Sequence, residues 1–199
     1  MDNIKEYTII FLISGIVQLL MQKYISNIGY KFNQVLKIIF AIIVGLINCY
    51  LFYKYSFGYN FLLYSLLIEV LIVITLLDFQ YEIILNRLNI SVAIIGLFNI
   101  IITKDFYNGI LAFFTAGGLF FILAIISNGG IGGGDIKLIA PLGLIFGIYP
   151  ILYIIMLSFI FASVIGIVLI ILRIKGLKSS IALAPYISLA TISLIIYYM

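Results

Sequence analysis

The chain has 199 residues, of which 65% are hydrophobic and 9% are charged, and its formal net charge is +4. Soluble domains average about 45–50% apolar and about 25% charged residues, so this composition excludes an ordinary soluble protein. The sequence has no histidine, which excludes Ser-His-Asp and Cys-His catalytic sets and HExxH zinc sites. A single cysteine, Cys49, excludes a disulfide framework or a paired-cysteine zinc module within the chain. Carboxylates are therefore the expected acid-base groups.

Long apolar runs predict an all-α, polytopic membrane helix bundle with about eight transmembrane helices. The N-terminal run is interpreted as a retained first span, and residues 1–199 as one integral membrane domain without an internal repeat. A continuous sixth and seventh span through Tyr149 and Pro150 is the alternative to eight separate helices. The expected spans are residues 7–23, 35–54, 61–79, 90–103, 109–127, 136–148, 151–172 and 181–199.

The basic residues predict the orientation of these spans. Three of the eleven fall on one side (Lys5, Lys54 and Lys104), and eight fall on the other (Lys23, Lys31, Lys37, Arg87, Lys137, Arg173, Lys175 and Lys178). Because cytoplasmic loops carry the excess of Lys and Arg, the richer side is expected in the cytoplasm, with segments 80–89, 128–135 and 173–180. The sequence thus predicts a multi-pass protein of the cell (cytoplasmic) membrane. Its expected partner is the lipid bilayer, and no nucleic acid is expected.

Two of the seven acidic residues stand at the ends of expected spans on this predicted inner face. Asp78 closes the third expected span, and Asp135 opens the sixth after the glycine-rich run 129–134. Taken singly, Asp78 is explained as an interfacial acid, Asp135 as a helix N-cap and the glycines as a flexible hinge. The run nevertheless has more glycine than a cap needs, and glycine permits positive φ and close approach of another backbone, such as an extended peptide. Solvated or headgroup-level charges are expected for Asp2, Glu6 and Asp105.

Two aspartates beside a glycine-rich segment, in a chain without histidine, suggest the aspartic-protease arrangement. One carboxyl group then holds a proton while the other activates a water molecule. The helix dipole favours an anion at a helix N-terminus and disfavours it near a C-terminus. Our hypothesis is that Asp135 is the anionic base and Asp78 the protonated acid, as the preferred state of a coupled pair.

Three segments carry a family resemblance. Gly132-Gly133-Gly134-Asp135-Ile136-Lys137-Leu138 matches a GxGDxKL motif, and Asp78 is followed by a polar stretch that ends at Asn86, where Leu85 replaces a usual proline. Lys178 leads into Pro185-Tyr186 at the start of the last span. The chain thereby resembles the type IV prepilin peptidases, relatives of the archaeal preflagellin peptidases in the GxGD class of membrane aspartic proteases.

The resemblance implies a function. Asp78 and Asp135 would be the catalytic pair of an aspartic endopeptidase that removes a short cytoplasmic leader from prepilin-like substrates, just before their apolar helix. Motif support would come from Gly132, Gly134, Lys137, Asn86 and Pro185. Larger relatives carry a cysteine-rich zinc module linked to N-methylation, and the interval 22–34 has no cysteine here. A peptidase without methyltransferase activity is expected, with no metal and no cofactor.

Other interpretations stay open. Glu69, well inside the third span, must face protein, and it fits a protonated structural hydrogen-bond partner better than a group that shapes the site for the substrate's helix. Anchoring of basic residues at the cytoplasmic membrane face explains Arg87 and Lys137 without a catalytic role. Pro185 fits either a helix kink or a proline in the first helical turn. The rival functions are a small transporter or channel, a catalytically inert pilus-assembly protein, and an intramembrane protease of the presenilin type. The last usually has Tyr-Asp and Pro-Ala-Leu motifs, where this chain has Leu77-Asp78 and Ala184-Pro185-Tyr186.

Overall fold

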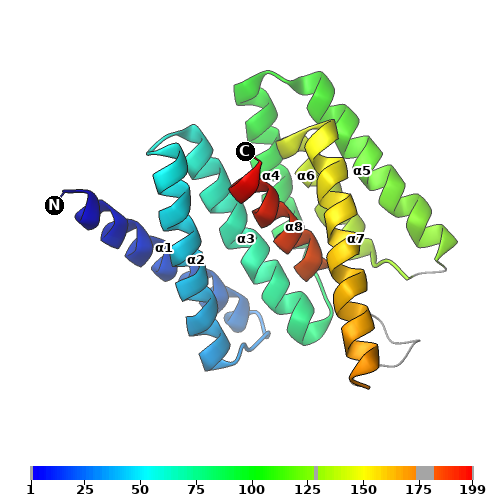
Figure 1. The fold of residues 1–199 in the computed structure, drawn as a ribbon, viewed down its shortest axis with the longest axis horizontal. Coiled ribbons are helices and arrows are strands. Elements are labelled where there is room, and N and C mark those ends of the chain that lie inside the picture. The colour runs from blue at the N-terminus through cyan, green and yellow to red at the C-terminus, as the bar shows by residue number, and fades with distance from the viewer. Residues whose placement is uncertain (1, 128–129, 174–181, 199) are drawn as a thin grey trace. The chain divides into compact units, whose positions relative to one another are not determined.

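The computed structural model describes residues 2–127, 130–173 and 182–198, and within these ranges the fold is all-helical (Figure 1). The prediction of an all-α bundle with eight helices is confirmed. The described helices are α1 (Asp2–Asn27), α2 (Gln34–Tyr55), α3 (Tyr59–Tyr81), α4 (Asn86–Thr103), α5 (Phe106–Ile126), α6 (Gly133–Phe146), α7 (Ile148–Ile171) and α8 (Ala184–Tyr197).

Six of these helices, α1 to α5 and α7, are long and apolar enough to cross a membrane, so the chain is a multi-pass membrane protein. Both α6 and α8 have 14 residues. At 1.5 Å per residue each is about 21 Å long, shorter than a hydrocarbon core of about 30 Å. Of the eight expected spans, six are therefore long enough to cross the membrane, and α6 and α8 are shorter helices.

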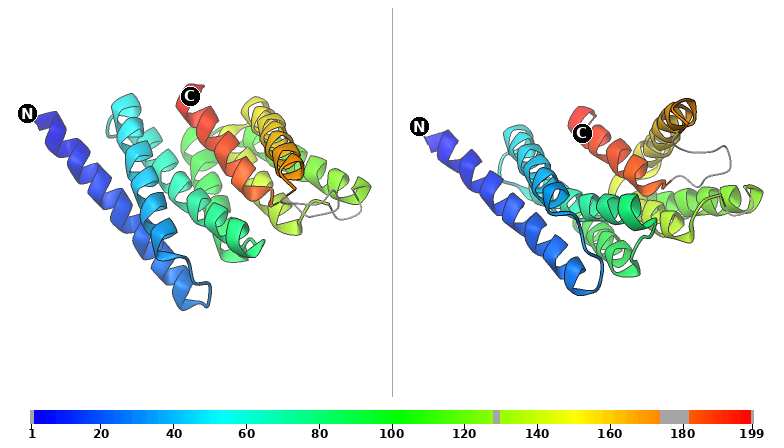
Figure 2. Two further views of the ribbon diagram at one scale, coloured as in Figure 1. Left: turned by 60° about the horizontal axis from the view of Figure 1, so that its bottom comes forward. Right: turned by 90° about the horizontal axis from the view of Figure 1, so that it is seen from below.

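The chain forms two compact units, Met1–Gln80 and Tyr81–Met199, and each is described by itself. The expectation of a single domain stays a prediction. In the first unit α1 and α2 run antiparallel as a helical hairpin (Figures 1 and 2). Gly45 of α2 permits their close approach, because a Cβ atom there would lie 2.7 Å from the ring of Phe11. Edge-to-face contacts then link Tyr7 to Phe52 at 5.5 Å and Phe52 to Phe61 of α3 at 5.8 Å between ring centroids.

In the second unit the short helix α6 packs against both α4 and α5. Glycines allow this packing. A Cβ atom on Gly143 would lie 2.6 Å from the backbone of Ala112 in α5, and one on Gly96 would lie 3.0 Å from the carbonyl oxygen of Pro141 in α6. Small residues at such crossings let helix backbones approach closely in a membrane. Helices α7 and α8 also pack against each other in this unit, and they lie side by side in Figure 1.

Two of the helix boundaries that differ from the sequence prediction affect the interpretation of the chain. The chain breaks between α6 and α7 at Gly147, which adopts a φ of 77°, so Tyr149 and Pro150 lie in the first turn of α7. A continuous helix through these two residues is therefore wrong. The other difference is the start of α4 at Asn86 instead of residue 90. Leu85 is extended, and its carbonyl accepts the N–H of Asn89 at 3.3 Å, which begins the helix earlier.

Candidate functional site

Asp135 lies in the first turn of α6. Gly132 is extended and precedes the helix, and its N–H donates a hydrogen bond of 3.2 Å to Oδ2 of Asp135. Asp135 is thus the third helical residue, and its interpretation as the N-cap is wrong. A carboxylate in the first helical turn interacts favourably with the helix dipole. The side chain is only 8% exposed, so its protein surroundings govern its chemistry.

Two of the neighbouring glycines have little space for a side chain at the start of α6. A Cβ atom on Gly134 would lie 3.0 Å from Cβ of Ile84, and one on Gly132 would lie 3.1 Å from Oδ2 of Asp135. No described glycine of this run has a positive φ, and Gly129 lies outside the described residues. Close approach, rather than positive φ, explains Gly132 and Gly134. At Gly133 a Cβ atom would meet nothing within 4 Å.

Two asparagines of α4 reach the first turn of α6. Nδ2 of Asn89 donates a hydrogen bond of 3.3 Å to the carbonyl oxygen of Gly134, and Nζ of Lys137 donates one of 3.2 Å to Oδ1 of Asn86. Residues three apart on a helix share a face, which explains why Asn86 and Asn89 both point to α6. The structure therefore brings together five of the predicted site residues, Asp135, Gly132, Gly134, Lys137 and Asn86, and adds Asn89.

Asn89 lies outside the predicted site residues, because the expected fourth span begins only at residue 90 and gives Asn86 and Asn89 no common helix face. Once Asn86 and Asn89 are placed on one helix, their spacing of three residues predicts a shared polar face. The sequence signal was therefore present, and the missing information was the start of α4 at Asn86.

Asp78 lies in the last turn of α3, in the first compact unit, and is 5% exposed. Residues 80 and 81 continue the helix beyond its expected end at residue 79, so the polar stretch after Asp78 begins as helix. The location of Asp78 near a helix C-terminus agrees with the sequence analysis. Its pairing with Asp135 stays a prediction.

Glu69 lies near the middle of α3 and is 3% exposed. When the amide nitrogen of Gln18 faces it, that nitrogen donates a hydrogen bond of 2.6 Å to Oε2 of Glu69. The amide oxygen of Gln18 then accepts a hydrogen bond of 3.2 Å from Nε2 of Gln22. These three side chains, the Glu69 network, join α1 to α3 inside the first unit. Glu69 thus faces protein, as its depth in the span requires, and its structural role stays a prediction.

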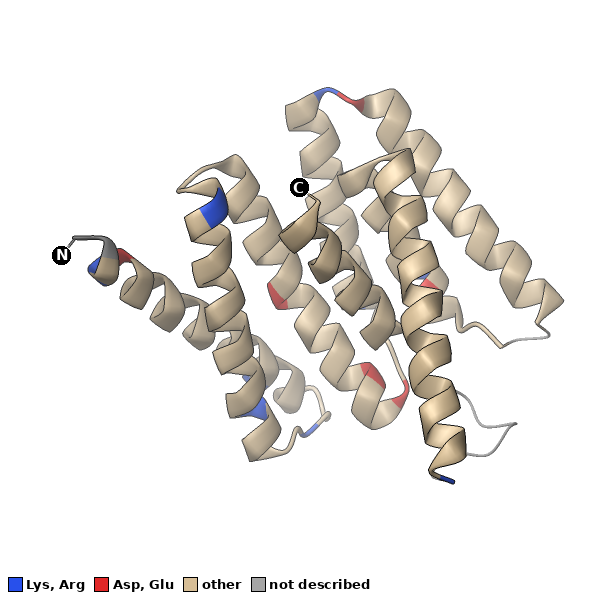
Figure 3. Cartoon of the chain, in the orientation of Figure 1, with Lys and Arg blue, Asp and Glu red and all other residues tan. Residues whose placement is uncertain are grey.

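The other charged residues and Pro185, the last predicted site residue, lie outside these two clusters. Figure 3 shows charged residues near helix ends and connections, apart from the acid in the middle of α3. Pro185 lies in the first turn of α8, where a proline costs no helical hydrogen bond. Its supporting role stays a prediction, and Lys175 and Lys178 lie outside the described residues.

Comparison with known proteins gives one finding. A family model described as the type IV leader peptidase family matches residues 65–171, more than half of the chain. The matched range includes Asp78, the polar face of α4 and the first turn of α6, whereas Pro185 lies beyond it. No curated protein and no solved structure matches the chain.

Proposed function

This chain belongs to the type IV leader peptidase family, and on that premise we propose that it is an aspartic endopeptidase that cleaves prepilin-like proteins. The observation that carries the proposal is the family match over a range that includes both Asp78 and Asp135. The other acids within the matched range are Glu69, Glu82 and Asp105. Glu69 binds Gln18, and Asp105 accepts a hydrogen bond from Asn108 at an exposed site. Asp78 and Asp135 are buried in helix end turns instead, which favours them as the acid-base pair.

The proposed chemistry needs one charged and one neutral carboxyl group. Asp135, in the first turn of α6, takes a proton from water while the water oxygen attacks the scissile carbonyl carbon. Asp78, in the last turn of α3, gives its proton to the carbonyl oxygen. As the tetrahedral intermediate collapses, the C–N bond breaks, the proton held by Asp135 passes to the leaving amine, and Asp78 regains a proton from the intermediate. Both aspartates thus end in their starting states.

We propose a cytoplasmic location for this reaction, at the inner face of the cell membrane. The support is the sequence pattern, which assigns eight of the eleven Lys and Arg residues to the side predicted for Asp78 and Asp135, and cytoplasmic loops carry this bias. The substrate would present a short leader there, followed by an apolar helix. The single cysteine of the chain also supports a peptidase without the cysteine-rich methyltransferase module.

The test is cleavage of a model prepilin by the purified chain in liposomes. We expect cleavage at the leader boundary by the wild type and by Asp105→Asn, a control at an exposed acid. Asp78→Asn and Asp135→Asn should each lose cleavage while their helical circular dichroism is retained. Wild-type protein that leaves several pilin-like substrates intact, or an active Asp78→Asn variant, would contradict the proposal.

A further inference from the structure

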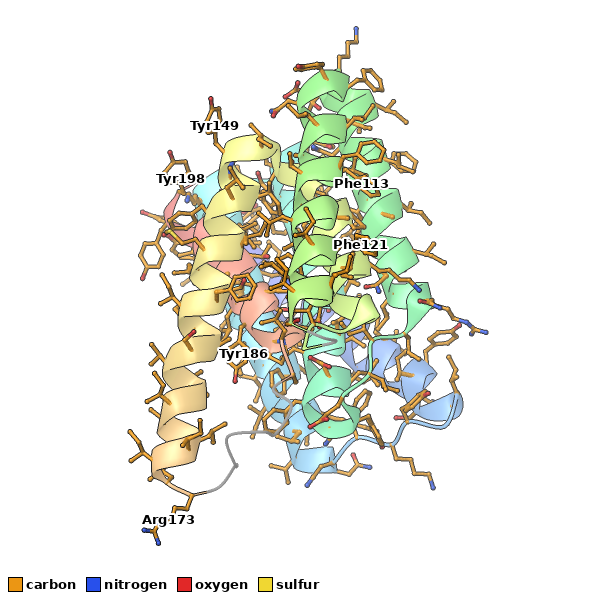
Figure 4. All side chains as sticks on the ribbon, turned by 90° about the vertical axis from the view of Figure 1, so that its right-hand side faces the viewer. Phe113, Phe121, Tyr149, Arg173, Tyr186 and Tyr198 are labelled. Carbon is orange, nitrogen blue, oxygen red and sulfur yellow. The ribbon has the colours of Figure 1, made fainter. Side chains whose placement is uncertain are left out.

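A groove of about 680 Å³ lies in the second unit between α4, α5 and α6. Its lining is apolar along most of its length and includes Ile90, Ala93, Gly118, Phe121, Ala140 and Pro141. Figure 4 labels Phe113 and Phe121, which lie one below the other along α5. Eight residues on a helix span about 12 Å, so the groove accommodates about two turns of another helix.

The floor of the groove is shaped by small residues. A Cβ atom on Gly118 would meet nothing within 4 Å, so the groove is open at this position. Gly117, Ala93 and Ala140 also line it. Small residues let a second helix approach closely in a membrane, where helix association depends on packing and interhelical hydrogen bonds.

One end of the groove is polar and holds a buried acceptor without a donor. Asn86, Asn89 and Lys137 line this end. Asn89 is 5% exposed, and its Oδ1 has no hydrogen-bond partner among the described residues. Pro141, in the groove wall, has no N–H and cannot donate to the carbonyl of Lys137 as a regular helical residue would. A buried acceptor without a donor is costly, and a lipid acyl chain has no donor to offer.

The polar end is also joined to the first turn that carries Asp135. The amide nitrogen of Asn89 binds the carbonyl oxygen of Gly134, the residue before Asp135, while its unpartnered oxygen belongs to a side chain that lines the groove. One side chain therefore connects the candidate catalytic turn to the groove.

We infer that this groove binds the apolar helix of the peptidase's own substrate, with the helix N-terminus at Asn89. This inference rests on the proposed function. The first four N–H groups of any helix lack acceptors within that helix, and Oδ1 of Asn89 supplies one. The apolar turns that follow fill the space over Gly118, between the aromatic side chains of α5 and the wall of α6. This placement puts the peptide bond that precedes the substrate's helix beside the first turn of α6.

The first test fills the groove. Gly118→Leu adds a side chain at a position where a Cβ atom meets nothing within 4 Å, and it replaces a weak helix former by a strong one. In liposomes we expect this variant to raise KM for a prepilin-type peptide by about 10-fold with little change in kcat, since it removes binding rather than chemistry. Ser163→Leu, at an exposed position of α7, is the matched control and should leave KM unchanged.

The second test detects binding without cleavage. A photo-crosslinking residue replaces Phe121 in the Asp135→Asn protein, and a second protein carries it at Ile167, an exposed residue of α7. We expect capture of the peptide's apolar segment from position 121, loss of that capture when Gly118→Leu is added, and weak capture from position 167.

The outcomes separate the two proposals. Normal cleavage with an unchanged KM in Gly118→Leu overturns the groove as the substrate site and leaves the peptidase intact. Crosslinks from position 121 to lipid only also overturn it, with lipid as the occupant. If position 121 captures the peptide specifically but the wild-type protein cleaves no substrate, the groove is supported as a binding site and the peptidase proposal is overturned.

Discussion

Each compact unit buries amide side chains, but these side chains bond to different kinds of partner. In the Glu69 network of the first unit, Gln18 and Gln22 bond to other side chains and join α1 to α3. In the second unit, Asn89 and Asn99 of α4 donate to backbone carbonyls at the two ends of α6. The first arrangement holds two spans together, whereas the second fixes a short helix that carries Asp135. Glu69 thus lies in a network of side chains in one unit, whereas Asp135 lies at a helix end that is held through its backbone in the other.

The largest expected effect contrasts the two buried acids. Asp135→Asn should lower kcat by at least about 10³-fold, because catalysis loses the group that takes a proton from water. Glu69→Gln keeps a hydrogen-bonding side chain toward Gln18 and should retain most of the activity. The measurement is the rate of leader cleavage in liposomes at saturating substrate. Equal losses in the two variants would show that burial of an acid, rather than its place at the first turn of α6, decides the effect.

The sequence predicted the helices and the motif around Asp135 better than it predicted the start of α4. Hydrophobic runs of about 20 residues are dictated by the membrane, so the helices could be predicted from composition and length. The motif around Asp135 also located the first turn of α6. The early start of α4 could not be predicted, because Asn86 and Arg87 are polar and a hydropathy scan ends at them. That start is marked by hydrogen bonds to the carbonyl of Leu85, and with the packing of α4 on α6 it brings Asn89 to Gly134.

The sequence predicted that Glu69 needs a partner within the protein, but it did not identify that partner. Burial in a membrane demands a partner for Glu69, but sequence cannot tell which polar residue of another helix supplies it. Gln18 is 51 residues away along the chain, and only the packing of α1 and α3 brings the two side chains together. The catalytic pairing of Asp78 with Asp135 stays a prediction for the experiments above.

The second expected effect distinguishes the roles of Asn89 and Asn99, two asparagines of α4. Asn89→Ala removes the bond to the carbonyl of Gly134, and the resulting misplacement of the Asp135 turn should lower kcat/KM by about 10²-fold. Asn99→Ala removes bonds of 3.4 and 3.0 Å to the carbonyls of Leu144 and Ile145 at the far end of α6. Loss of that buried partner should lower the free energy of unfolding by about 1–3 kcal/mol while kcat stays near normal.

Thermal unfolding in detergent and cleavage kinetics, measured on the same preparations, test this pair. A normal kcat/KM in Asn89→Ala would mean that the bond to Gly134 serves folding alone. A reduced kcat in a folded Asn99→Ala protein would mean that the far end of α6 also positions Asp135.

The third effect concerns stability in the first unit. Gln18→Leu leaves Glu69 without the amide donor and should lower the free energy of unfolding by about 1–3 kcal/mol. Adding Glu69→Leu should recover much of that loss, since an apolar pair can replace a buried polar one. Unfolding of the two single variants and the double variant in mixed micelles gives the coupling energy. Additive losses would contradict a direct interaction between Gln18 and Glu69.

The fourth effect uses two adjacent glycines as a matched pair. Gly134→Ala places a Cβ atom 3.0 Å from Cβ of Ile84, so the first turn of α6 or the chain before α4 must shift. Overpacking of this kind costs about 1–3 kcal/mol, and part of it should appear as a lower kcat. Gly133→Ala meets nothing within 4 Å and should cleave like the wild type. Equal rates in the two variants would remove close packing as the reason for Gly134.

The smallest expected effect concerns Lys137. Side chains two apart on a helix point in different directions, so Lys137 is poorly placed to pair with Asp135, and it donates to Asn86 at an exposed site instead. Exposed hydrogen bonds contribute about 1 kcal/mol, so Lys137→Met should change the cleavage rate by less than about 10-fold. Lys137→Gln keeps a donor but loses the charge, and it separates the two causes. A normal rate in Lys137→Gln with a reduced rate in Lys137→Met assigns the effect to the bond with Asn86, whereas equal reductions assign it to the positive charge near Asp135.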